Sequence, residues 1–208
     1  MSSPTTAQAS NGLNRPSAEI VERFAQLPTA NVGDAMDRLG ALDARIKPVW
    51  HGATIAGPAF TVWTRAGDNK LLHEAMRQAA PGDVLIVNGQ GDETRALLGE
   101  LMAERAKVLG LAGFVVDGAV RDAEVIGEIE LPVFARAITP AGPYKNGPGR
   151  LGGVVAVGGV AVAPGDIVLG DADGVVIVPQ QDAEQVLEAA EAKFADETAQ
   201  RAEIKAGR

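Results

Sequence analysis

The 208-residue chain contains no cysteine, which removes several kinds of chemistry at once. Disulfide bonds, thiolate zinc sites and thiol nucleophiles all require cysteine and are excluded. Serine is nearly as scarce, and the four serines lie in or beside a polar N-terminal stretch (Ser2, Ser3, Ser10 and Ser17). A serine nucleophile on a G-x-S-x-G turn is therefore excluded as well. Two histidines, His51 and His73, are too few for most histidine-built metal sites.

The sequence also lacks long apolar runs and any excess of positive charge. No apolar run approaches membrane-spanning length and the N-terminus has no signal-peptide core, so we expect a cytoplasmic protein without a membrane partner. The net charge of −8 argues against nucleic acid as a partner, because binding the phosphate backbone requires a basic face. The lysines lie in predicted polar loops or helix faces, whereas a Schiff-base lysine needs a desolvated pocket. Carboxylates, arginines, backbone amides and a hard metal ion remain.

The order of predicted elements indicates one α/β domain. Residues 1–15 are polar and aperiodic, which predicts a disordered leader, and residues 16–208 predict a single domain that ends in a C-terminal helix from Asp182. Between residues 84 and 135 strands and helices alternate, which predicts right-handed crossovers and a partly parallel sheet. Short apolar segments between residues 154 and 178 predict a β-rich second half.

Turn and cap residues predict the local features of this domain. Ser17 is a candidate N-cap, and the strand-like residues 53–64 contain Gly57-Pro58, which predicts an edge strand or a bulge. We expect a short helix over Val32–Leu39 and a polar connection over residues 88–94. Asp117-Gly118 predicts a turn that ends the strand before it.

Residues 99–122, GELMAERAKVLGLAGFVVDGAVRD, combine residue types that can bind an anion and a metal. Glu100 and Arg121 have 20 residues between them, and both follow predicted parallel strands, at the edge where such sheets bind ligands. The planar guanidinium of Arg121 can bind a carboxylate, and Asp122 is a hard oxygen ligand for Mg²⁺ or Mn²⁺. Gly99, at the start of a predicted helix, lets an anion approach the free backbone amides there. On these residues alone, an ordinary helix start with Asp122 near its positive end is an equally good interpretation.

This stretch resembles the signature of the RraA-like family, which includes aldolases for 4-hydroxy-4-methyl-2-oxoglutarate and 4-carboxy-4-hydroxy-2-oxoadipate. That signature is an acidic residue, twenty residues and Arg-Asp, with the ending V-x-D-G-x-V-R-D; residues 115–122 read VVDGAVRD. The similarity covers roughly residues 28–180 and includes four further segments (Asn31–Ala35, Gly67–Asn69 with His73, Pro81–Asp83 and Gly170–Val176). The resemblance implies the family's β/β/α fold, assembled as a homotrimer or a hexamer.

The resemblance also implies a role for each matching residue in a metal-dependent (class II) pyruvate aldolase. Arg121 would bind and polarise a small 2-oxo acid, and Asp122 would be the direct protein ligand of Mg²⁺ or Mn²⁺. Glu100 occupies the acidic position, where aldolases of this type carry aspartate, and would take part in proton transfer. The substrate's carboxylate or oxo group would bind backbone amides at the helix start (Gly99, Glu100, Leu101 and Met102). Glu197 is the candidate for a tail glutamate that a neighbouring subunit contributes to the metal through water.

The implied reaction is retro-aldol cleavage of a 4-hydroxy-2-oxo di- or tricarboxylic acid with release of pyruvate. Without a Schiff-base lysine, the enolate must be stabilised electrostatically, by a divalent cation and Arg121. The same chemistry would decarboxylate oxaloacetate. The alternative is a non-catalytic regulator that binds ribonuclease E, as some family members do, although such a module has no need for Arg121 and Asp122. A methyltransferase is not supported, because no glycine-rich S-adenosylmethionine motif is present.

The remaining polar candidates are interpreted as structural. His73 falls beside the apolar face of a predicted helix, which favours a hydrogen-bonded structural residue over a ligand. Asp171 and Asp173 are interpreted as a turn between two strands. Lys145 and Arg150 lie in a Pro/Gly-rich segment and are expected to be solvated.

Overall fold

The protein is built on an eight-stranded sheet, and the computed structural model describes residues 14–207. The strand order is β1-β5-β4-β3-β2-β9-β10, with β6 paired to β2, and β7 and β8 form a separate hairpin. The strands are β1 (Lys47–Pro48), β2 (Ile55–Thr64), β3 (Val84–Ala96), β4 (Gly113–Val120), β5 (Val133–Ile138), β6 (Gly149–Leu151), β7 (Val155–Val157), β8 (Val160–Val162), β9 (Ile167–Asp171) and β10 (Gly174–Val178). The helices are α1 (Ala18–Phe24), α2 (Thr29–Ala35), α3 (Lys70–Gln78), α4 (Glu100–Val108), α5 (Ala123–Ile129) and α6 (Ala183–Lys205), with a short 3₁₀ turn η1 (Gln180–Asp182).

The centre of the sheet is parallel, which confirms the predicted fold class. β2 pairs with β3, β3 with β4, and β4 with β5, all in parallel, through crossovers that contain α3, α4 and α5. Alternate residues of β3 face opposite sides: Leu85 packs with α3 and α4, whereas Ile86 packs with β7 and β8. Both faces are therefore buried, as is usual for a parallel sheet.

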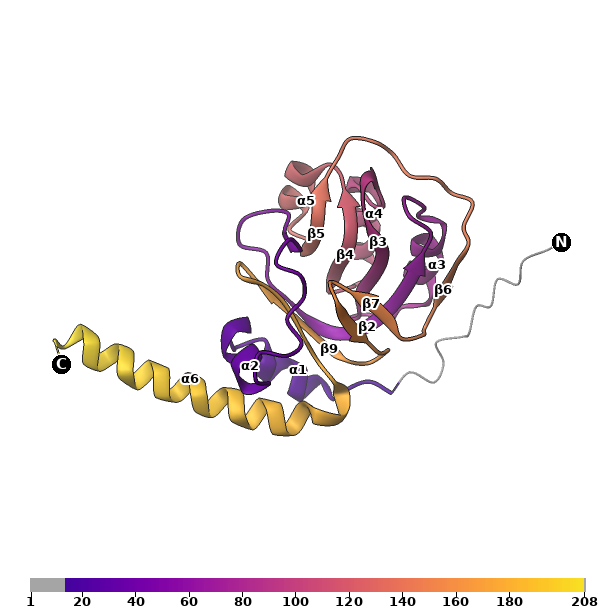
Figure 1. Cartoon of the computed structure of the whole chain (residues 1–208). Helices are drawn as coiled ribbons and strands as arrows, with labels where there is room; N and C mark the ends of the chain where they lie inside the picture. The colour runs from indigo at the N-terminus through magenta and orange to yellow at the C-terminus, as the bar shows by residue number, and fades with distance from the viewer. Residues whose placement is uncertain (1–13, 208) are drawn as a thin grey trace.

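The second half of the chain is antiparallel. β9 and β10 form a hairpin that extends the sheet from β2, and a third apolar cluster joins them to α1, α2 and the first half of α6. Val186, Leu187 and Ala190 are the buried face of α6 there, and its C-terminal half projects away from the body (Figure 1). Among residues 14–207, no helix combines the length and the apolar character needed to cross a bilayer.

Gly57-Pro58 marks neither an edge strand nor a bulge within either pairing of β2, so that expectation is wrong. β2 lies inside the sheet and exchanges partners at this point: Ile55–Pro58 pairs with β9, and Ala59–Trp63 pairs with β3. Pro58 is the last residue of the β9 pairing, so its missing N–H falls where the strand changes neighbours.

Two predicted connections are in fact strand. Residues 88–94 belong to β3 and Asp117-Gly118 belongs to β4, and the two strands stay paired through register shifts near Asp92. Asp117 remains inside the sheet because its carboxylate is paired: it accepts from Arg136 Nε at 2.6 Å and from Gly158 N at 2.8 Å. A buried charge with these partners has no need of the surface that a turn would provide.

Two boundaries at the N-terminal end also differ from the expected ones. The helix expected at Val32–Leu39 is α2, which begins at Thr29 because the Asp171 carboxylate accepts from Thr29 N and Oγ1. Residues 1–13 of the expected leader lie outside the described residues. Arg15 donates Nε and Nη2 to Asp83, both at 2.8 Å, so the folded part begins before residue 16.

Candidate active site

Two segments distant in sequence meet at the carboxyl end of β4. Arg121 N donates to Leu98 O at 3.0 Å, which joins the end of β4 to the start of α4. Glu100 N donates to Asp122 Oδ2 at 3.2 Å, and Arg121 Nε lies 3.4 Å from the same oxygen. The structure therefore brings Glu100, Arg121 and Asp122 together, as the sequence pattern predicted, at the sheet edge where α/β proteins bind ligands.

Gly99 allows this close approach because it has no side chain. A Cβ on Gly99 would lie 2.3 Å from Asp122 Oδ2 and 2.9 Å from Arg121 Cγ, well inside van der Waals contact. Met102 N donates back to Gly99 O at 3.1 Å, and Glu100 N is held by Asp122. Leu101 is thus the first-turn residue whose amide is left for a ligand.

Asp122 has one carboxylate oxygen without a protein partner among residues 14–207. Its backbone is left-handed (φ 58°, ψ 39°), a conformation that aspartate and asparagine adopt more readily than other residues with side chains. Oδ2 faces Glu100 and Arg121, while Oδ1 has no protein partner among residues 14–207. The side chain is 34% exposed and that of Arg121 is 43% exposed, so both can be reached from solvent.

The donor set fits a cation that keeps water and substrate among its ligands. Within the described part of the chain, no group of three or more histidine, cysteine, aspartate or glutamate side chains could enclose a metal ion. Mg²⁺ is commonly held by one or two carboxylates, with water and substrate oxygens completing its shell. Asp122, with its unpaired oxygen, suits that pattern, whereas residues 14–207 of one chain form no all-protein cage.

A long connection from β5 to β6 passes over this edge of the sheet (Figure 1). A Cβ on Gly142 in this connection would lie 3.5 Å from Arg121 Nη1. Asp68, which is fully buried, accepts from Asn146 N at 2.7 Å and from Gly147 N at 2.8 Å and so fixes the far part of the connection. Arg95 at the end of β3 donates Nη1 to Gly142 O at 3.2 Å. Arg95 was not identified as a candidate from the sequence, because it directly follows residues 88–94, which were interpreted as a polar connection.

Asn69 is a second polar residue near the start of α4 whose role the sequence did not indicate. Its side chain is buried, and Nδ2 lies 3.5 Å from Met102 Sδ. Its Oδ1 is buried and without a partner in the described structure. A buried acceptor without a donor is destabilising, so such atoms often mark a place where a polar ligand or water binds.

Glu197 is not brought to this place within one chain. It lies on α6, where it accepts from Asn31 Nδ2 at 2.9 Å and lies 3.7 Å from Lys193 Nζ. Glu100 is nearby but half-buried, and its carboxylate has no partner among residues 14–207. The Glu100 carboxylate is therefore available for proton transfer, and the Glu100 amide joins this residue to Asp122.

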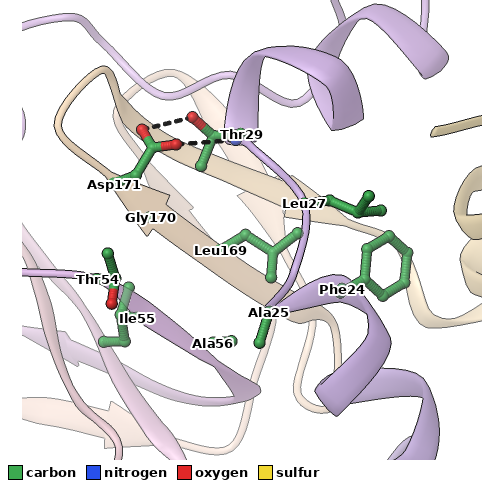
Figure 2. Close-up of a pocket in the computed structure, with 10 residues that line it drawn as sticks. All are labelled: Phe24, Ala25, Leu27, Thr29, Thr54, Ile55, Ala56, Leu169, Gly170 and Asp171. Carbon is green, nitrogen blue, oxygen red and sulfur yellow. Dashed lines mark hydrogen bonds between the residues drawn. The ribbon is translucent and has the colours of Figure 1, made fainter. Parts of the chain in front are cut away.

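The other polar candidates have structural partners. Figure 2 shows a small cavity of about 120 Å³ in which Asp171 is held by Thr29, with Leu169, Ile55 and Phe24 around it. Asp171 also accepts from Asp173 N at 2.9 Å in the β9–β10 hairpin, which confirms the turn interpretation.

Two exposed cations and His73 complete the surroundings of the β5–β6 connection. Lys145 and Arg150 are exposed, as expected, and the Arg150 guanidinium lies 4.9 Å from the centre of the Trp63 ring.

Burial lowers the pKa of His73, and Lys145, Arg105 and Arg77 lower it further. A neutral histidine is the form expected for a structural residue on a packed helix.

Comparison with known proteins identifies relatives over most of the chain. The family model described as Aldolase/RraA matches residues 29–177. A protein of Halalkalibacterium halodurans named "Putative 4-hydroxy-4-methyl-2-oxoglutarate aldolase" is 41% identical over 181 residues, which cover 87% of this chain and 86% of that protein.

Solved structures of related proteins have the same fold. RraAS2 of Streptomyces coelicolor, called an unusual member of the RNase ES inhibitor RraA family, aligns with a TM-score of 0.83 at 29% identity, covering 91% of this chain and 99% of that one. The RNA-processing inhibitor RraA of Thermus thermophilis aligns with a TM-score of 0.67 at 36% identity, covering 73% of this chain and 92% of that one.

Proposed function

The chain belongs to the RraA-like family, and from that membership we propose that it is a divalent-metal-dependent aldolase. Its substrate would be a 4-hydroxy-2-oxo di- or tricarboxylic acid, and its product pyruvate. The name of the Halalkalibacterium halodurans relative supports this reaction class. The observation that carries the proposal is the meeting of Arg121, the Asp122 carboxylate and the start of α4 at one sheet edge.

Arg121 and the start of α4 would bind the 2-oxo acid end of the substrate. The Arg121 guanidinium is planar and always charged, so it pairs with a carboxylate or an enolate oxygen through charge-assisted hydrogen bonds. The amide of Leu101 points from the first turn of α4, where the helix dipole favours negative charge. These fixed donors would stabilise the negative charge that develops on the substrate's oxo oxygen as the bond breaks.

Asp122 would hold the divalent cation, Mg²⁺ or Mn²⁺, together with substrate and water oxygens. When bound, the cation would supply Lewis-acid stabilisation of the pyruvate enolate. Breakage of the C3–C4 bond turns the C4 hydroxyl into a carbonyl, so one proton leaves that hydroxyl and one is delivered to C3. The Glu100 carboxylate has no partner among residues 14–207. It would accept the proton of the C4 hydroxyl or deliver a proton to C3. Loss of carbon dioxide from oxaloacetate forms the same enolate and would be a side activity.

A neighbouring subunit would complete the site. The projecting half of α6 supports a homotrimer or hexamer, in which Glu197 would reach the metal of the next subunit through water (Figure 1). Because Glu197 binds Asn31 in its own chain, that contact would have to rearrange on assembly. Sedimentation that shows a fully active monomer would remove Glu197 from the site.

A second candidate function is regulation of a ribonuclease without catalysis. The Streptomyces and Thermus relatives, which are named as RNase or RNA-processing inhibitors, favour it. An inhibitor that acts through surface contacts has no use for a free carboxylate oxygen beside a guanidinium. Substitution of Asp122 would therefore leave ribonuclease inhibition unaffected and abolish aldolase activity.

The test is pyruvate release from a panel of 4-hydroxy-2-oxo acids and oxaloacetate, measured with lactate dehydrogenase and NADH. We expect turnover with Mg²⁺ or Mn²⁺, loss of turnover after exhaustive chelation, and recovery when the metal is restored. Full turnover after chelation would contradict the metal-dependent class. No pyruvate from any substrate with either metal would contradict the enzyme proposal itself, and inhibition of ribonuclease E would then be measured directly.

A further inference from the structure

Arg95 and Arg121 approach the same residue from two strands. Arg95 Nη1 donates to Gly142 O at 3.2 Å, and a Cβ on Gly142 would lie 3.5 Å from Arg121 Nη1. Gly142 belongs to the connection that passes over the candidate site, and Ala141 O accepts from Ala96 N at 2.8 Å to fix it there. The guanidinium groups of Arg95 and Arg121 therefore both lie close to Gly142.

Arg95 forms no ion pair with an acidic side chain among residues 14–207. Among the half-buried arginines of residues 14–207, Arg15, Arg121 and Arg136 each pair with an aspartate, and Arg95 pairs with none. Glu93, the nearest acid in sequence, is exposed, and Asp92 uses Oδ1 to accept from Thr94 N and Oγ1. Asp92 Oδ2 lies beside the Arg95 side chain near Gly67 but forms no ion pair with the guanidinium. A guanidinium has five N–H donors, and a single protein hydrogen bond is recorded for Arg95.

The Arg95 side chain is nevertheless held in place. Its guanidinium carbon lies 4.2 Å from the centre of the Tyr144 ring, which is within cation–π range. On the other side, Gly67 leaves room for it: a Cβ on Gly67 would lie 2.9 Å from Arg95 Cδ. A positioned cation with unused donors and no acidic partner is prepared for an anion that the protein does not supply.

We propose that Arg95 binds the carboxylate at the far end of the substrate, while Arg121 holds the 2-oxo acid end. This inference rests on the proposed aldolase function and assigns the residue that recognises the second carboxylate of its substrate. Arg95 would thus be a specificity-determining residue. It would favour dicarboxylic over monocarboxylic substrates through a charge-assisted pair that lysine, a point charge without the planar fork, reproduces incompletely.

The test compares two reactions that differ in the second carboxylate. One is cleavage of 4-hydroxy-4-methyl-2-oxoglutarate; the other is exchange of the pyruvate methyl protons in D₂O, followed by NMR, which uses only the 2-oxo acid end. For Arg95→Gln we expect kcat/KM for cleavage to fall about 10- to 100-fold, mainly through KM. The loss in pyruvate exchange should be at least tenfold smaller. Arg95→Lys should lie between wild type and Arg95→Gln.

Two further variants separate substrate binding from a role in holding the connection. Arg105→Gln removes an exposed arginine of the same charge from α4 and should leave the ratio of the two activities at the wild-type value. Tyr144→Leu removes the ring that supports Arg95. If Tyr144→Leu and Arg95→Gln each lower cleavage and exchange by the same factor, Arg95 acts only by holding the connection. Equal losses of cleavage and exchange in Arg95→Gln and Arg95→Lys would overturn the proposal while the aldolase function stands. A wild-type protein that catalyses neither reaction would overturn both.

Discussion

Gly99→Ala tests whether the start of α4 and Asp122 form one site. The added methyl carbon would lie 2.3 Å from Asp122 Oδ2, so restoring an ordinary 3.4 Å contact requires a displacement of about 1.1 Å (3.4 − 2.3). A misplacement of roughly 1 Å in a catalytic group typically lowers the rate about 10²-fold. We therefore expect kcat/KM for pyruvate release to fall by about that factor in a metal-saturated assay.

The same substitution should leave the fold almost unchanged. Gly99 has an extended backbone (φ −147°, ψ −167°) that alanine adopts without strain. Loss of the Glu100–Asp122 hydrogen bond costs about 1 kcal/mol, and replacing glycine gains about 0.4–1 kcal/mol through the unfolded state. The melting temperature should therefore change by no more than about 4 °C. Gly153→Ala is the matched control, because a Cβ there meets nothing within 4 Å. Wild-type turnover in Gly99→Ala would show that the chemistry lies elsewhere.

Three further predictions concern single residues. Asp122→Asn keeps the left-handed backbone but removes the charge. We expect both metal affinity, measured by calorimetry, and pyruvate release to be lost, while the melting temperature stays within about 4 °C of wild type. Retained metal binding would exclude Asp122 as the ligand. Asp68→Ala leaves the amides of Lys70, Asn146 and Gly147 without their acceptor. The free energy of unfolding, measured in urea, should therefore fall by at least about 3 kcal/mol. A loss below about 0.5 kcal/mol would contradict the role of Asp68 in fixing the β5–β6 connection. The folded-state pKa of His73 is lowered, so its contribution to stability is present above the unfolded pKa of about 6.5 and is lost as pH falls below it. The decrease in urea midpoint between pH 7.5 and pH 5 should therefore be smaller in His73→Gln, and an unchanged decrease would refute this contribution.

The parts of the fold that follow local rules could be predicted from the sequence. Ser17 was identified as an N-cap, and its hydroxyl accepts from Ile20 N at 3.3 Å. The alternation of apolar strands and helices predicted the parallel centre, because such a sheet buries strands on both faces. The meeting of Arg121 with Glu100 followed from the rule that carboxyl ends of parallel strands share one edge.

The features that depend on distant partners could not be predicted in the same way. Asp117-Gly118 has the composition of a turn, and only Arg136 and Gly158, both remote in sequence, explain why it remains strand. Pro58 was interpreted by its missing N–H, but a single sequence does not show where a strand exchanges neighbours. Arg95 contacts Gly142 because the β5–β6 connection passes beside the end of β3. No local sequence pattern predicts the path of such a connection.

The most direct test of the account is the turnover of Arg121→Lys in pyruvate release with saturating Mg²⁺. Arg121 lies 3.4 Å from Asp122 Oδ2 and is 43% exposed, so an exposed structural role predicts a stability change below about 0.5 kcal/mol and unchanged turnover. If its guanidinium stabilises the enolate, lysine cannot reproduce the geometry, and kcat should fall about 10²- to 10³-fold. Metal binding through Asp122 should be retained, which calorimetry on the same preparation measures. Wild-type turnover in Arg121→Lys would contradict the assignment of this site.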